Sequence, residues 1–149
     1  MKSAKPLYTD CYCTQIRRAS SEATKIYDDA LRPQGLRITQ FSMLRGLGRL
    51  GEATLTELAN ELALDRTTMS RSVRLLMDAG WVDAAAGEKD GREKILTLND
   101  RGRKTIAEAM PLWSKAQAKI EKHLKNYVKS PTNKGLIEAL ETLQFKGEA

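Results

Sequence analysis

The chain contains 149 residues, which is enough for one domain or two small lobes with a buried core. No segment approaches the roughly 18 consecutive apolar residues of a transmembrane helix, so the sequence excludes a helical membrane-spanning protein. The formal net charge of +6 favours an anionic partner, although charge alone does not distinguish a nucleic acid from a membrane surface.

The N-terminal residues and the two cysteines indicate the compartment in which the chain works. The stretch "MKSAKPLYTDCYCT" has no apolar core of a secretory signal, and the spacing of Cys11 and Cys13 is poor for a structural disulfide framework. We therefore expect a cytoplasmic protein without a membrane partner.

The first part of the chain is predicted to be helical. Apolar residues spaced three or four apart predict a helix over residues 14–32, which Pro33 and Gly35 end. A second helix follows, with Thr39 as its expected N-cap and Gly51 at its end.

Two further helices have recognisable starting residues. Thr54 and Glu57 are spaced as a capping box at the start of "LTELANEL". Asp65 is the expected N-cap of a helix over residues 66–79, and Gly80 stops that helix. Two short strands, "WVDAA" and "EKILTLN", then form a hairpin whose loop is the charged segment 87–93.

A long helix is predicted from Asn99 onwards, followed by a short one over residues 136–143. A seam of mostly apolar residues runs along the long helix and indicates packing against other helices, although Pro111 is expected to kink it. The seam consists of Ile106, Met110, Trp113, Gln117, Ile120, Leu124 and Tyr127. One chain offers too few partners to bury the apolar faces of the terminal helices. We therefore expect residues 14–32 and 99–145 to hold a homodimer together.

The expected fold is therefore mainly α with a small β-hairpin. A winged helix-turn-helix occupies residues 36–98 and is flanked by N- and C-terminal dimerisation helices. The turn between the helix "LTELANEL" and the helix over residues 66–79 carries Ala63 where a glycine is usual.

The helix over residues 66–79 has two different faces. Met69, Val73, Leu76 and Met77 form one apolar face. The other face carries arginines, which suit guanine edges or phosphates, and hydroxyl side chains, which suit phosphates or thymine methyl groups. A solvated amphipathic helix would have the same pattern, but the hairpin that follows favours DNA recognition. The candidate DNA-binding residues are Arg66, Thr67, Thr68, Ser70, Arg71 and Arg74.

These motifs resemble those of the MarR-type transcriptional regulators (multiple antibiotic resistance regulators). The resemblance rests on "ITQFSMLRGLGRLG", "TLTELANELALDRTTMSRSVRLLMDAGWV" and "LTLNDRG", and it extends over about residues 11–144. It implies that Asp90 and Arg92 form an Asp-x-Arg motif in the wing, whose arginine enters the minor groove, with Lys89 beside it. Gly91, at a position often basic in the family, implies a weaker charge there. The resemblance also implies dimerisation through the first and last helices.

The expected function is sequence-specific binding of double-stranded DNA by a homodimer, as a repressor that responds to a ligand or to oxidation and recognises an inverted repeat. The family holds small aromatic or anionic effectors between its dimer helices and its winged helix. The implied effector pocket consists of Tyr27, Phe41, Met110 and Trp113, for which simple core packing is the alternative.

Two other interpretations remain open. In the first, the winged helix contacts only other proteins and does not bind DNA. In the second, Cys11 and Cys13 sense an oxidant and gate DNA binding, whereas inert thiols are the plainer explanation.

The sequence gives no support for an enzyme or a cofactor. The stretch "GLGRLG" matches a dinucleotide fingerprint only formally, because it ends a predicted helix instead of following a strand. His123 is the single histidine, and no Ser/His/Asp set, HExxH motif or P-loop accompanies it. Two cysteines and one histidine cannot complete a tetrahedral metal site in one chain, although a dimer could pool its ligands, and we expect no metal.

Overall fold

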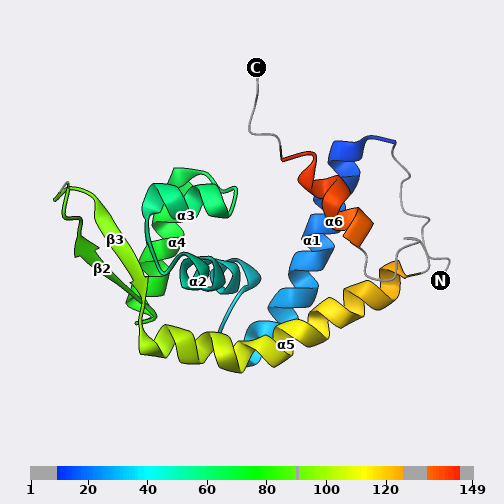
Figure 1. The fold of residues 1–149 in the computed structure, drawn as a ribbon. Helices are drawn as coiled ribbons and strands as arrows, with labels where there is room; N and C mark the ends of the chain where they lie inside the picture. The colour runs from blue at the N-terminus through cyan, green and yellow to red at the C-terminus, as the bar shows by residue number, and fades with distance from the viewer. Residues whose placement is uncertain (1–9, 90, 126–133, 145–149) are drawn as a thin grey trace, which may run out of the picture.

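Helices dominate the computed structural model, which describes residues 10–89, 91–125 and 134–144 (Figure 1). In chain order the elements are α1 (Tyr12–Leu31), η1 (Arg32–Gln34), α2 (Ile38–Leu50), β1 (Glu52–Thr54), α3 (Leu55–Glu61), α4 (Arg66–Asp78), β2 (Val82–Ala86), β3 (Lys94–Leu98), α5 (Asp100–Leu124) and α6 (Lys134–Glu141). The predicted fold class, mainly α with a small hairpin between flanking helices, is confirmed.

The sheet has one strand more than the sequence predicted. β2 and β3 form the expected antiparallel hairpin, in register from Val82 opposite Leu98 to Ala86 opposite Lys94. β1 pairs with the other edge of β3, so that the strand order is β1-β3-β2. Ala53 of β1 is buried opposite Leu96, which ties the start of α3 to the hairpin.

The elements from α2 to β3 enclose the main core, and we call them the lobe. Phe41, Met43 and Leu44 of α2 have no exposed surface, and neither has Met69 of α4. Leu96 of β3 completes the core from the sheet. Burying such side chains is worth about 1.5–3 kcal/mol each, so the lobe has the apolar contacts that an independently folding unit needs.

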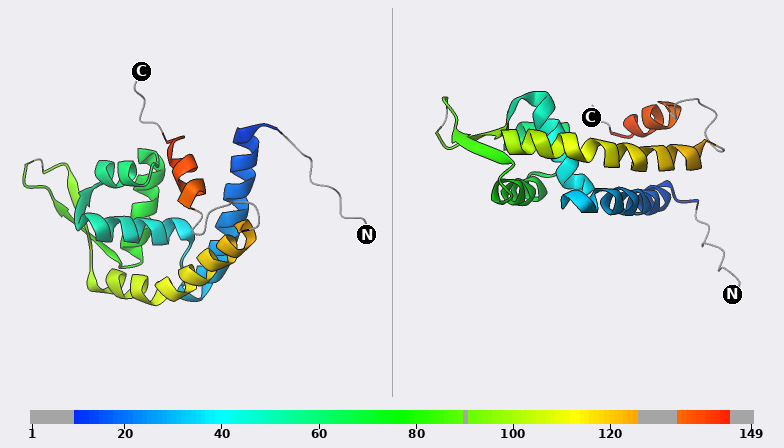
Figure 2. Two further views of the ribbon diagram at one scale, coloured as in Figure 1. Left: turned by 45° about the vertical axis from the view of Figure 1, so that its right-hand side comes forward. Right: turned by 90° about the horizontal axis from the view of Figure 1, so that it is seen from below.

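The helices α1, α5 and α6 extend away from the lobe, and we call them the arms. α1 and α5 contact each other and run side by side, which is clearest from below (Figure 2). α5 continues past Pro111 and bends near its middle (Figure 1), as the sequence predicted. Tyr127, the last residue of the predicted seam, lies outside the described residues. Among the described residues, no helix is both long and apolar enough to cross a bilayer.

Three helix starts differ from the sequence prediction, and α6 is one of them, because it begins at Lys134 instead of at residue 136. α1 begins at Tyr12, two residues earlier than expected, with Cys11 as its N-cap. Thr39 is not the cap of α2, because Arg37 occupies that position and Thr39 lies inside the helix. The side chain of Asp28 accepts a hydrogen bond from the Ile38 amide at 2.8 Å, so a residue of α1 supplies the cap that local sequence could not reveal.

Candidate DNA-binding surface

The start of α4 is fixed by an anionic cap. The Asp65 carboxylate accepts hydrogen bonds from the Thr68 amide at 2.8 Å and from the Thr68 hydroxyl at 2.5 Å. The hydrogen bond from the Thr68 side chain, followed by that from its backbone, lowers the pKa of Asp65. Asp65 is therefore the N-cap that the sequence predicted, and the hydroxyl proton of Thr68 is engaged in the cap.

The outer side of α4 gathers the predicted polar residues on one surface. Met69, Val73 and Leu76 are buried against the lobe, whereas Met77, predicted on the same apolar face, is 36% exposed because it lies at the edge of that face. All six predicted recognition residues of α4 are exposed. Five of them, with Leu55 of α3, line one shallow depression: Arg66, Thr67, Ser70, Arg71 and Arg74. We call this surface the recognition face.

The turn between α3 and α4 has the geometry that a glycine usually supplies. Ala63 has φ +51°, in the left-handed region. The Leu64 amide donates to the Ala59 carbonyl at 3.0 Å, and the Ala63 amide donates to the Asn60 carbonyl at 3.3 Å, which closes the end of α3. An alanine in this conformation costs about 1–2 kcal/mol, so the turn is formed at some expense of stability.

The wing extends from the lobe at the end opposite the arms (Figure 1). The Gly87 amide donates to the Glu93 carbonyl at 2.7 Å and closes the hairpin below its tip. Lys89 and Arg92 are exposed at this tip. Asp90, predicted to form a motif with Arg92, lies outside the described residues. The exposed cations of the wing and of α4 belong to one lobe, which is the arrangement that binding to adjacent grooves of a duplex requires.

The four residues of the predicted effector pocket meet where the arms join the lobe. Trp113 of α5 stacks on Tyr27 of α1, with ring centroids 6.4 Å apart, and lies 6.3 Å from Phe41 of α2. Met110 packs against the same core. Phe41 has no exposed surface, so on the lobe side these rings are core packing.

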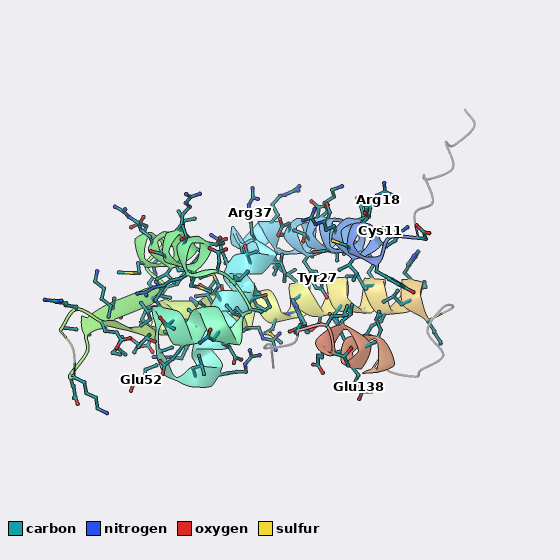
Figure 3. The ribbon with its side chains drawn as sticks, turned by 90° about the horizontal axis from the view of Figure 1, so that it is seen from above. Cys11, Arg18, Tyr27, Arg37, Glu52 and Glu138 are labelled. Atoms are coloured by element: carbon teal, nitrogen blue, oxygen red, sulfur yellow. The ribbon has the colours of Figure 1, made fainter. Side chains whose placement is uncertain are left out.

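Two polar side chains contact this aromatic cluster: Arg45, which no sequence pattern pointed out, and Gln117, which was predicted only as the polar position of the α5 seam. The guanidinium of Arg45 lies 4.8 Å from the centroid of Trp113 and 5.7 Å from that of Phe41. The Tyr27 hydroxyl, between α1 and α5 (Figure 3), donates a hydrogen bond to Gln117, and burial raises the pKa of Tyr27, with a smaller contribution from Glu121. Arg45 and Gln117 each follow a ring residue by one helical turn, a spacing that could have found them.

The two cysteines lie at the start of α1. Both are exposed, and Cys11 is the N-cap residue of the helix. The hydrogen bonds of Thr14, first through its side chain and then through its backbone, lower the pKa of the Cys11 thiol. This environment favours the thiolate, which is the reactive form of cysteine.

A helix-turn-helix followed by a β-hairpin wing defines a winged-helix protein. Comparison with related proteins shows the family to which this chain belongs. Residues 34–93 match the MarR family. The transcriptional regulator YwoH of Bacillus subtilis, described as uncharacterized, is 32% identical over 94 residues, which cover 63% of this chain and 68% of YwoH. An HTH-type transcriptional repressor of Mycobacterium tuberculosis is 33% identical over 91 residues, covering 61% of this chain and 66% of the repressor.

A solved structure agrees with these relatives. The transcriptional regulator MosR of Mycobacterium tuberculosis, crystallised with DNA, superimposes with a TM-score of 0.79 at 32% identity, covering 91% of this chain and 94% of MosR. The chain belongs to the MarR family. Its relatives are transcriptional regulators and not enzymes, as the sequence predicted.

Proposed function

We propose that the chain binds double-stranded DNA sequence-specifically through the recognition face and the wing, and that it represses transcription. The observation that carries the proposal is the recognition face itself: three arginines and two hydroxyl side chains line one exposed surface of a capped helix. Arginine recognises guanine edges and phosphates, and small hydroxyl residues suit phosphates. The names of the mycobacterial relatives, a repressor and a regulator crystallised with DNA, support both parts of the proposal.

The salt dependence of duplex binding tests the proposal. Duplexes selected from a random pool are bound at several salt concentrations, and the logarithm of affinity should fall linearly with the logarithm of salt, by about 0.9 per phosphate neutralised. An affinity that does not change with salt would overturn the proposal and favour a winged helix that only contacts proteins.

The protein is also proposed to act as a homodimer on an inverted repeat. Tyr12 is 86% exposed on α1, and Leu143 is 63% exposed near the C-terminal end. A second copy would cover such arms, and twofold symmetry is the commonest arrangement of two identical chains. Two recognition helices would then contact one side of a duplex, about one helical turn apart. Light scattering at micromolar concentration checks the dimer, because a species of 16.6 kDa would exclude it.

An aromatic acid is the proposed class of effector, with the aromatic cluster as its place of action. Arg45 supplies a cation beside the rings of Trp113 and Phe41, which matches a carboxylate next to an aromatic ring. Benzoate is a simple probe, and Trp113 fluorescence is the readout in a Trp81→Phe variant. Quenching that saturates, together with release of DNA, supports the site. Unchanged fluorescence at millimolar benzoate would leave core packing as the role of these rings.

Redox control through Cys11 is a second candidate, favoured by its exposure and lowered pKa. A peroxide would transfer one oxygen to the Cys11 thiolate, forming a sulfenic acid, and would itself be reduced to water or an alcohol. Peroxide should then weaken DNA binding by the wild type and leave a Cys11→Ser variant unaffected. A Cys13→Ser variant is the matched control, and equal loss in all three proteins would exclude a role for Cys11.

A further inference from the structure

One side chain joins three elements where the lobe meets the arm α5. Asn99 follows β3 and is the N-cap of α5, where its Oδ1 accepts a hydrogen bond from the Gly102 amide at 2.9 Å. Its Nδ2 donates to the Gly80 carbonyl at 3.0 Å and to Oδ1 of Asp83 at 3.2 Å. Gly80 directly follows α4 and its C-cap residue, Ala79, and Asp83 lies in β2. The recognition helix, the wing and the arm are thus linked at one residue.

The two halves of the Asn99 amide have separate roles. Capping α5 requires only the oxygen, which any Asn, Asp, Ser or Thr side chain provides. The nitrogen is not needed for the cap and contacts only the lobe. The reverse orientation of the amide would set two N–H groups against each other at Gly102 and two oxygens against each other at Gly80, so the surroundings define its direction.

The backbone around Asn99 leaves little space for adjustment. A Cβ atom on Gly102 would lie 2.3 Å from the Trp81 carbonyl oxygen, so the first turn of α5 rests directly on the turn between α4 and β2. Gly80 has φ +76°, and a Cβ there would lie 2.7 Å from the Arg101 guanidinium. The backbone N–H of Asn99 also donates to the Trp81 carbonyl at 3.2 Å. The close packing and the hydrogen bonds of Asn99 hold the same joint.

We propose that Asn99 is a positioning residue that sets the angle between the arm α5 and the lobe, and thereby the separation of the two recognition faces in a dimer. The inference rests on the proposed function, which is binding of an inverted repeat by a homodimer. α5 begins directly beside the base of the hairpin (Figure 1) and also contacts α2, so a change of angle at this joint moves α4 and the wing together relative to the rest of α5. Asn99 itself contacts no DNA in this proposal.

Three variants, made from two substitutions, separate the positioning role of Asn99 from its capping role. Asn99→Asp keeps the size and the capping oxygen, but it removes both bonds of the nitrogen and places a carboxylate against Asp83. Asp83→Asn alone keeps an acceptor for Asn99 and is the matched control. The double variant N99D/D83N restores a donor and an acceptor across this pair and has the net charge of the wild type, so it should recover part of the binding.

The measurement compares operators that differ in geometry. Duplexes selected by the wild type are prepared with the preferred spacer, with spacers one or two base pairs shorter or longer, and as single half-sites. N99D should bind a single half-site within about twofold of the wild type, because each lobe keeps its own core. It should lose about tenfold on the preferred duplex, because the joint is no longer held at the angle that the preferred spacer requires, and it should discriminate less among spacers. Asn99→Ser, which caps α5 without adding charge, should behave in the same way.

The possible outcomes distinguish the inference from the proposed function. A wild type without any spacer preference would overturn the inverted-repeat proposal and this inference with it. Variants with the wild-type spacer profile would overturn the inference alone. A loss of equal size on single half-sites and on every spacer would assign Asn99 a purely structural role and would also overturn it. Unfolding curves and light scattering identify the folded dimers on which the comparison is made, with N99S replacing N99D if the latter does not fold.

Discussion

The lobe and the arms differ in how much of their apolar surface one chain buries. Among the described residues, eight large side chains are almost fully buried, and all but Leu31 belong to the lobe. The 25 residues of α5 bury only Gly102, Ala109 and Ala116, and the 20 residues of α1 bury only Leu31. The lobe has a complete core, whereas the arms keep large apolar side chains exposed, which the proposed second chain would cover. Apolar periodicity predicted helices equally well in both regions. Only the burial of their side chains separates the helices that form a core within one chain from those that leave apolar surface exposed.

The largest change in dimerisation and DNA affinity is expected when charges are placed on the exposed apolar face of the arms. Ile137 and Leu140 of α6 are 52% and 37% exposed. Replacing both by aspartate should give a folded monomer, because a carboxylate cannot be buried in an apolar interface without a partner. Affinity for an inverted repeat should then fall about 100-fold or more, since the second half-site no longer binds within the same complex. Light scattering and titration with single and double half-sites measure both effects.

Glu141→Gln on the same helix is the control for that experiment, because it changes an exposed polar residue and no apolar one. It should leave a dimer with wild-type affinity. A double-aspartate variant that stays dimeric would show that α6 lies outside the interface.

The next largest effect should come from the recognition face. Arg71→Ala should cost about 1–3 kcal/mol of DNA binding and relax the preference at particular base pairs, because Arg71 lines the recognition face at the centre of α4. Lys119→Ala, on the exposed side of the arm α5, removes the same charge at another place and is the matched control. Equal losses for all sequences would identify Arg71 as a phosphate contact, and equal losses for both variants would argue against the recognition face.

A smaller effect tests the backbone of the lobe. Ala63→Gly should raise the free energy of unfolding by about 1 kcal/mol or less, because relief of the left-handed conformation exceeds the entropy that a glycine adds to the unfolded chain. Ala107→Gly, on the exposed side of α5, should instead lower it by about 1 kcal/mol. Urea midpoints of the two variants measure the difference, and midpoints that move in the same direction would contradict it.

The local features of the fold could be predicted from the sequence, because neighbouring residues determine them. The capping box of Thr54 and Glu57 has both hydrogen bonds, at 3.1 and 2.8 Å, and Gly51 and Gly80 end their helices as expected. The exposed face of α4 followed from a helical repeat alone. The turn at Ala63 was recognised despite the missing glycine, because the motif on either side of it was intact, whereas its left-handed conformation is seen only in the structure.

The features that escaped prediction depend on residues distant in the chain. β1 has three residues and no repeat of its own, and it forms a strand only because β3 lies beside it. The cap of α2 comes from Asp28 on another helix. Arg45 lies one helical turn after Phe41, but it reaches Trp113 only when α2 meets α5, and Asn99 reaches Gly80 only when α5 is placed against the lobe. Tertiary packing determines each of these contacts, so the local sequence pattern could not predict them.

The smallest expected effect is confined to the lobe and depends on pH. Hydrogen bonds from the side chain and then the backbone of Thr68 lower the pKa of Asp65, so the folded chain binds this proton less tightly than the unfolded chain. The charged cap therefore stabilises the lobe fully above the unfolded-state pKa, and this contribution disappears as the pH falls through the lowered folded-state pKa. Asparagine caps helices at any pH, so Asp65→Asn serves as a reference without titration. The urea midpoint of the wild type relative to D65N should be higher at pH 7 than at about pH 3, with the dimer unchanged, and a constant difference over this range would contradict the role of the charge.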